Sequence, residues 1–158
     1  MPMGEIGRTA GWTLALLLAT GLALGAGSAR AEDSHAGDGV RIEVTVLLAS
    51  GQPGESDPRC ERFDKLLRGQ VAYESLSIVD SHVREVPLDE VWTVELPTHK
   101  QLQIRALAAD PQQGTLLSLD VEESVQGDFR VRRGQPLVVG GPRFGEGRLV
   151  VVFETEAP

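Results

Sequence analysis

Short stretches in which apolar and polar residues alternate dominate this chain. The clearest spans residues 40–48, where an apolar residue occupies every second position from Val40 to Leu48. A period of two predicts a strand with one buried face. Residues 92–96, 102–106, 115–123 and 128–132 alternate in the same way, and residues 71–79 and 83–90 show less regular β-like patterns.

Three hairpins are predicted, two from pairs of these stretches and one from the apolar segments near the end of the chain. In residues 92–106, a register that places Leu96 opposite Leu102 also places Trp92 opposite Ala106 and buries every apolar pair, with His99 exposed at the tip. In residues 115–132, a turn centred on Gln126 would place Glu122 opposite Arg130. The same turn would place Asp120 opposite Arg132.

The last hairpin, residues 135–156, is expected to close the β-rich body formed by the preceding strands. Leu137 and Val139 are expected to oppose Val151 and Leu149, and the final strand is apolar at consecutive positions. Such a strand is typical of the centre of a sheet that is covered on both faces. A glycine-rich segment, residues 140–147, is expected to form the loop between the two strands.

One short helix interrupts the β pattern. Asp57-Pro58 resembles a cap followed by proline at the first helical position, apolar residues then recur at helical spacing, and Gly69 is expected to stop the helix. We therefore predict a helix over residues 58–68. The whole pattern predicts a mostly β fold: an antiparallel β-sandwich or partly open barrel of about eight strands with one short helix.

The chain begins with a pattern typical of export. Residues 1–31 contain Arg8, an apolar run from Trp12 to Ala26, and a small-x-small site ending at Ala31. These features predict a signal peptide cleaved after Ala31, with a retained anchor as the alternative. Residues 32–39 are expected to be a flexible tether and residues 40–156 a single β-rich domain, located in the periplasm or secreted and not inserted in the membrane after cleavage.

The charge balance narrows the class of partner. The chain has 15 basic and 23 acidic residues. Removing Arg8, Arg30 and Glu5 with the leader leaves 13 and 22, a net charge of about −9. Binding to phosphate backbones needs clustered Lys and Arg, so a nucleic-acid partner is not expected.

The residue types that carry chemistry do not form a recognisable set. Cys60 is the lone cysteine, interpreted as a buried small hydrophobe or, alternatively, as a thiol that pairs between chains. The three histidines His35, His82 and His99 have no metal-ligand spacing. Asp80-Ser81-His82 does not predict a catalytic triad, because consecutive strand residues point in alternate directions. We expect no catalytic residue, no cofactor and no metal.

Five arginines form the one basic concentration: Arg130, Arg132, Arg133, Arg143 and Arg148. They indicate either an anion-binding patch or, as we favour, charges neutralised by acidic residues across the hairpin. Arg143 is the exception, because it lies in the loop with no obvious partner. The loop itself lacks the Gly-Lys-Ser/Thr ending of a phosphate loop and leads into a strand. Arg143 and Phe144, which we expect to be exposed at its tip, are the candidate partner-binding residues.

The segments VELPTHKQLQIRAL and PLVVGGPRFGEGRLVVVF resemble a scattered group of exported proteobacterial β-rich proteins of unassigned function that end in a Gly-Gly-Pro-Arg turn. The apolar strand that runs into Gly-Gly is also similar to the terminal strands of secretins, but the pore-forming region of that family is missing. Neither resemblance implies a reaction.

The sequence therefore supports three hypotheses for function. The leading one is a non-catalytic periplasmic interaction domain that binds a protein partner or is accessory to an envelope assembly. The second is a small-ligand or glycan binder that uses a sheet face near Trp92 and Tyr73. The third is a hydrolase whose site assembles from distant strands.

Overall fold

Eight antiparallel strands and one short helical segment make up residues 39–156, the part of the chain that the structure, a computed structural model, describes. The predicted signal peptide and nearly all of the predicted tether lie outside these residues, although Gly39 already belongs to the first strand. The elements in chain order are β1 (Gly39–Ser50), η1 (Pro58–Cys60), α1 (Glu61–Leu67), β2 (Ser75–Pro87), β3 (Val91–Glu95), β4 (Gln101–Asp110), β5 (Gly114–Val121), β6 (Val125–Val131), β7 (Leu137–Phe144) and β8 (Gly147–Glu156).

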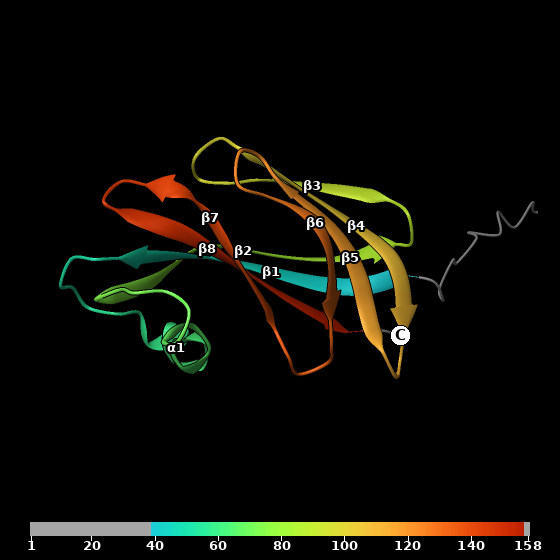
Figure 1. The fold of residues 1–158 in the computed structure, drawn as a ribbon, viewed down its shortest axis with the longest axis horizontal. Helices are drawn as coiled ribbons and strands as arrows, with labels where there is room; N and C mark the ends of the chain where they lie inside the picture. Colours follow the sequence, from blue (N-terminus) through green and yellow to red (C-terminus); the bar gives the residue numbers. More distant parts are fainter. Residues whose placement is uncertain (1–38, 157–158) are drawn as a thin grey trace, which may run out of the picture. The chain divides into compact units, whose positions relative to one another are not determined.

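The strands form two four-stranded sheets, ordered β2-β1-β8-β7 and β3-β4-β5-β6, which lie as two layers (Figure 1). The main core lies between them and is built from every second residue of the facing strands, such as Ile42 of β1, Ile104 of β4 and Phe153 of β8. The predicted class, a mostly β fold of eight antiparallel strands with one short helix, is confirmed; the barrel does not close.

Strands β1 and β8 are central in their sheet and covered on both faces, as the apolar run of the last strand predicted. Leu149, Val151 and Phe153 of β8 face the main core. Val150 and Val152 face a second, smaller core that α1 covers from outside the sandwich (Figure 1). Burying consecutive apolar residues requires cover on both sides of a strand, and the short helix supplies the second side.

The helical segment begins as the sequence predicted. The Asp57 side chain accepts a hydrogen bond from the backbone N–H of Arg59, and Pro58 occupies the first helical turn. Cys60, Phe63 and Leu67 point into the second core. Cys60 is only 2% exposed, which confirms it as a buried small hydrophobe. Burial raises the pKa of its thiol.

The two β-like stretches at residues 71–79 and 83–90 do not form separate strands. Residues 75–87 form a single strand, β2, which runs through Asp80-Ser81-His82 and ends at Pro87. Asp80 and His82 share a face, with Nε2 of His82 2.9 Å from Oδ2 of Asp80, while Ser81 belongs to the opposite face. The alternation that argued against a triad is therefore present in the structure.

The predicted registers of the first two hairpins are wrong. Trp92 pairs with Ile104 and not Ala106, because Leu96 begins a five-residue turn that is closed by the hydrogen bond from Leu96 N to Lys100 O (2.8 Å). The pairing is shifted by two residues, so the same side chains remain buried. The tip residue His99 is exposed, as predicted.

In the second of these hairpins the turn falls at Glu122–Ser124, so that Val121 pairs with Val125 and Arg130 lies opposite Leu116. The predicted cross-strand pairs of Glu122 with Arg130 and of Asp120 with Arg132 do not form.

Candidate functional site

The glycine-rich segment of the last hairpin is strand and not loop. β7 continues to Phe144, and only Gly145 and Glu146 connect it to β8. Gly145 has φ +57°, which suits the tight turn. The expected pairs of Leu137 with Val151 and of Val139 with Leu149 are wrong. Instead, Val139 pairs with Val151.

A β-bulge between Gly140 and Arg143 explains this difference. The bulge adds one residue to β7, which exchanges the two faces of the strand beyond it. Phe144 therefore turns inward, is only half-buried, and packs against the main core. Our expectation that Phe144 is exposed at the hairpin tip is wrong, because its ring packs against the main core and contributes to the fold.

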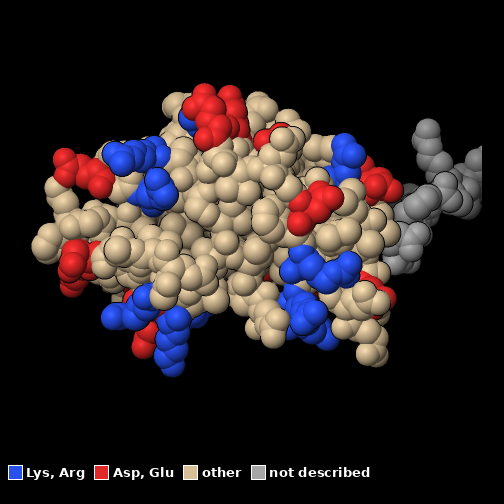
Figure 2. All heavy atoms as spheres, in the orientation of Figure 1, with Lys and Arg blue, Asp and Glu red and all other residues tan. Residues whose placement is uncertain are grey.

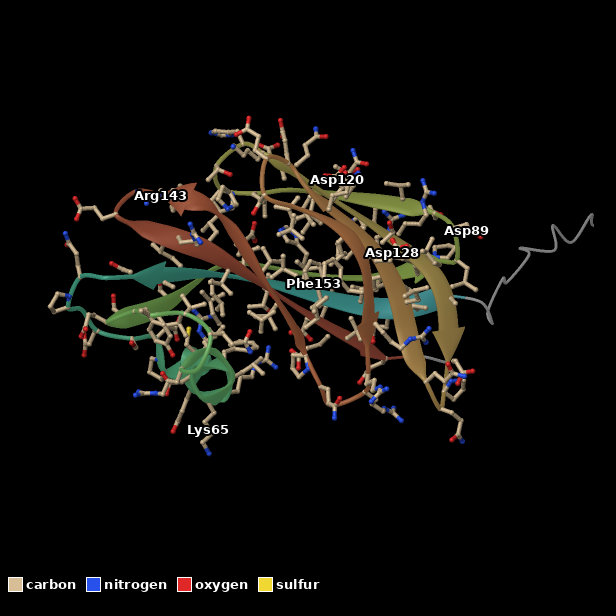
Figure 3. The ribbon with its side chains drawn as sticks, viewed as in Figure 1. Lys65, Asp89, Asp120, Asp128, Arg143 and Phe153 are labelled. Carbon is tan, nitrogen blue, oxygen red and sulfur yellow. The ribbon has the colours of Figure 1, made fainter. Side chains whose placement is uncertain are left out.

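The same bulge turns Arg143 outward. Arg143 lies directly opposite Arg148 across β7 and β8, on the outer face of the sheet, and both side chains are exposed. Figure 3 places Arg143 at the end of β7 beside the turn. Like charges directly opposite each other on antiparallel strands are destabilising.

No acidic side chain in residues 39–156 forms an ion pair with either of these two arginines. Every other arginine on this sheet and its helical segment has such a partner: Arg41, Arg59, Arg62, Arg68 and Arg84 pair with Glu156, Asp57, Glu43 and Glu154, Asp64, and Glu90 respectively. The Arg143–Arg148 pair is thus the exception among the described arginines of this sheet and its helical segment. Figure 2 shows blue Lys and Arg side chains and red Asp and Glu side chains interspersed around the visible face.

The two arginines border a groove of about 650 Å³ on the outer face of the sheet. The segment Gln70–Ala72, which follows α1, also lines this groove. The rest of its lining includes residues that are apolar or lack a side chain: the partly buried Val138 and the exposed Gly140, with the buried Ala49 and Val150 beneath. The acidic residue on its border, Glu146, accepts a hydrogen bond from the Gln52 side chain. We call this site the hairpin groove.

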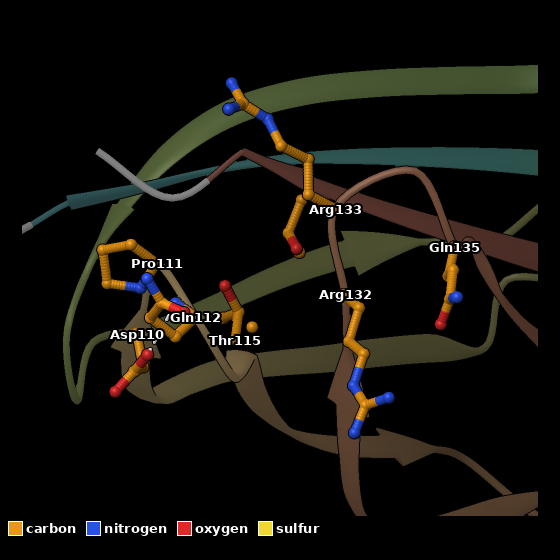
Figure 4. A pocket seen from close by; sticks show the side chains of 9 residues that line it. Asp110, Pro111, Gln112, Thr115, Arg132, Arg133 and Gln135 are labelled. Carbon is orange, nitrogen blue, oxygen red and sulfur yellow. Dashed lines mark hydrogen bonds between the residues drawn. The ribbon is translucent and has the colours of Figure 1, made fainter.

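The remaining members of the basic concentration lie elsewhere. Arg130, Arg132 and Arg133 belong to β6 and the turn after it, and none forms an ion pair within the described part of the chain. Arg132 and Arg133 border a cavity of about 270 Å³ next to the β4–β5 turn. Their guanidinium groups point in different directions (Figure 4), so they do not converge on one ligand. Thr115, which also lines this cavity, is fully buried.

The aromatic residues expected to serve a glycan binder are not available on a sheet face. Trp92 is 8% exposed and belongs to the main core. Tyr73 packs against the second core, and its hydroxyl donates a hydrogen bond to Oδ1 of Asp64 (2.8 Å). Burial, and then this hydrogen bond, raise the pKa of Tyr73 to about 12. Stacking on a sugar requires an open ring face, so this observation counts against the second hypothesis.

A shallow depression of about 310 Å³ on the second sheet gathers His99, Asp120 and Glu122. Each side chain already has a partner: His99 contacts Glu95 (2.9 Å), Asp120 accepts from Gln126 (3.3 Å), and Glu122 accepts from the backbone N–H of Gln101 (3.0 Å). The His99 side chain is 89% exposed, so water surrounds it. This arrangement gives no general acid or base a defined position against a substrate.

Within residues 39–156 there is no group of three or more His, Cys, Asp or Glu side chains that could hold a metal ion. No helix in this range is long and apolar enough to cross a membrane. Comparisons with protein-family models, with curated proteins and with solved structures found no match to the chain.

Sequence reasoning found Arg143 but missed its relation to Arg148. It had assigned Arg148 to the arginines neutralised across a hairpin. The usable signal was the two-residue turn Gly145-Glu146, which places Phe144 opposite Gly147 and Arg143 opposite Arg148.

Proposed function

We propose that this chain is a non-catalytic interaction domain of the bacterial periplasm that binds a protein partner, as a component of or an accessory to an envelope assembly. The leader-like residues 1–31 support the location. The observation that carries the binding role is the exposed Arg143, a charge without an acidic partner among the described residues, at the border of the hairpin groove.

The energetics favour an interaction role for this residue. Apart from Arg148, the other exposed arginines of the same sheet, Arg41 and Arg84, each form an ion pair with a carboxylate, and this arrangement lowers the repulsion between charges. Arg143 has another arginine as its cross-strand neighbour, so the fold gains nothing from its charge. A like-charge cross-strand pair that brings no gain in stability is the kind of exception expected at a functional site.

A crosslinked pull-down from the envelope fraction tests this proposal. Tagged wild-type protein, Arg143→Glu and the control Arg105→Glu are expressed in the native host. Arg105 is also an exposed strand arginine without an ion pair in the described residues, but it lies on β4 of the other sheet. We expect one crosslinked partner to be captured by the wild type and by Arg105→Glu and lost with Arg143→Glu.

Equal capture by all three proteins would refute the assignment of the contact to Arg143. Capture of nothing by the wild type would refute the interaction role itself. N-terminal sequencing of the same preparation tests export, and a mature chain that starts at Glu32 is the expected result.

A further inference from the structure

The hairpin groove has a chemical character that identifies the kind of segment it can bind. Two guanidinium groups project from one cross-strand pair at its border. Guanidinium groups bind carboxylates in bidentate geometry, and a carboxylate between two arginines relieves their mutual repulsion. The chain has a net charge of −8, yet these two positive charges lie side by side. A partner surface that is complementary to them in charge is acidic.

Gly140 leaves open space on the lining of the hairpin groove. It lies inside strand β7, and a Cβ atom added to it would meet no atom within 4 Å. Neither a positive φ nor close packing therefore requires glycine here. A glycine within a strand often marks a β-bulge or the place where a ligand or another backbone approaches closely. The β7 bulge begins at Gly140, and the open space above this glycine also leaves room for the backbone of a bound segment.

The remaining groove lining fits a chain with side chains and not a lone anion. The partly buried Val138 offers an apolar surface in the same groove as the arginines, above the fully buried Val150, and Gln70, Val71 and Ala72 also line the groove. A volume of about 650 Å³ is far more than one carboxylate or phosphate fills. An extended segment that alternates acidic and apolar residues can bind the arginine pair with its carboxylates and the apolar lining with its other side chains.

We propose that the hairpin groove binds an extended acidic peptide segment of the protein partner. A carboxylate of this segment lies between Arg143 and Arg148, its backbone crosses Gly140, and a neighbouring apolar side chain rests on Val138. This inference rests on the proposed function and names the chemistry of the partner segment.

An NMR titration of the folded, ¹⁵N-labelled mature protein tests it. The probe is an eight-residue blocked peptide in which Glu and Leu alternate; the comparison ligands are the same peptide with Gln in place of Glu, and inorganic phosphate. We expect saturable shifts confined to the amides of residues 70–72 and 138–150. Arg148→Gln and Arg143→Gln should each weaken binding at least about tenfold, and Arg105→Gln should leave it unchanged.

Gly140→Val separates a ligand role from a structural one. Valine fills this open space and favours the strand, so the melting temperature should stay equal or rise while peptide binding is lost. If Gly140→Val binds the peptide as well as the wild type, the backbone approach is refuted. If the Gln peptide binds equally, or if phosphate shifts the same amides with equal affinity, the acidic-peptide assignment is refuted.

Failure here is distinguishable from failure of the proposed function. A partner captured through Arg143 without binding of the acidic peptide would overturn only the inference about the segment. Peptide binding without a captured partner would overturn the envelope interaction and leave the groove as a peptide site.

Discussion

Arg148→Glu should stabilise the domain, although it removes a residue of the proposed binding site. The substitution replaces a like-charge cross-strand pair by an opposite-charge pair with Arg143. Two unit charges about 6 Å apart in water interact by about 0.7 kcal/mol, and 0.1 M salt reduces this to about 0.4 kcal/mol. Reversing the sign of one charge therefore raises the free energy of unfolding by about 0.8 kcal/mol. This corresponds to a melting temperature that is higher by about 3 °C.

Thermal and urea unfolding at low and high salt provide the assay. The gain should be largest in about 10 mM salt and nearly absent in 1 M salt, because the pair is exposed and the Debye length falls to about 3 Å. Arg148→Gln, which removes the repulsion without adding an attraction, should give about half of the gain. A loss of stability, or a gain that does not depend on salt, would show that Arg148 makes a stabilising contact within the fold and would refute the reasoning.

Three further predictions follow from the hairpin and the second core. Phe144→Ala should lower the free energy of unfolding by about 1–2 kcal/mol, since a half-buried ring leaves the core, and an unchanged urea midpoint would contradict this. Gly147→Ala should cost more than about 2 kcal/mol by the same measurement, because its Cβ would lie 2.5 Å from the Ala49 carbonyl oxygen; a wild-type midpoint would show that β1 and β8 can separate freely. Tyr73, the single tyrosine of the chain, should ionise near pH 12 in an absorbance titration of the folded protein. Its raised pKa contributes stability that is complete below pH 10 and lost as the pH rises to about 12; ionisation near pH 10 in the folded state would contradict it.

The aromatic content of the chain shows why a surface role cannot be assigned from residue type alone. Trp92 and Phe144 both suggested ligand or partner contacts, yet both pack against the main core. Trp92 occupies the buried face that its own alternation predicted, so its burial was available from the sequence. The orientation of Phe144 could not be predicted in this way, because it depends on the β-bulge between Gly140 and Arg143 that immediately precedes it.

Local patterns determined much of this fold. Alternation within residues 40–48 and 92–106 fixed which side chains face the core, since a strand turns its side chains by a period of two whatever its partner is. The consecutive apolar residues of β8 predicted a central strand covered on both faces, and Asp57-Pro58 predicted the start of the helical segment.

Tertiary structure decided the registers, the bulge and the site. Arg130 lies opposite Leu116 and not an acidic residue because of which residues form the turn between β5 and β6. Several turn positions are compatible with the same alternation of apolar and polar residues, so the sequence pattern does not select one of them. The bulge in β7 depends on how β7 and β8 pair as a whole, and Gly141 permits it where an added Cβ would lie 3.0 Å from the Leu149 carbonyl. One extra residue there exchanges the faces of the strand, so the final hairpin that closes the fold buries Phe144 and sets Arg143 against Arg148.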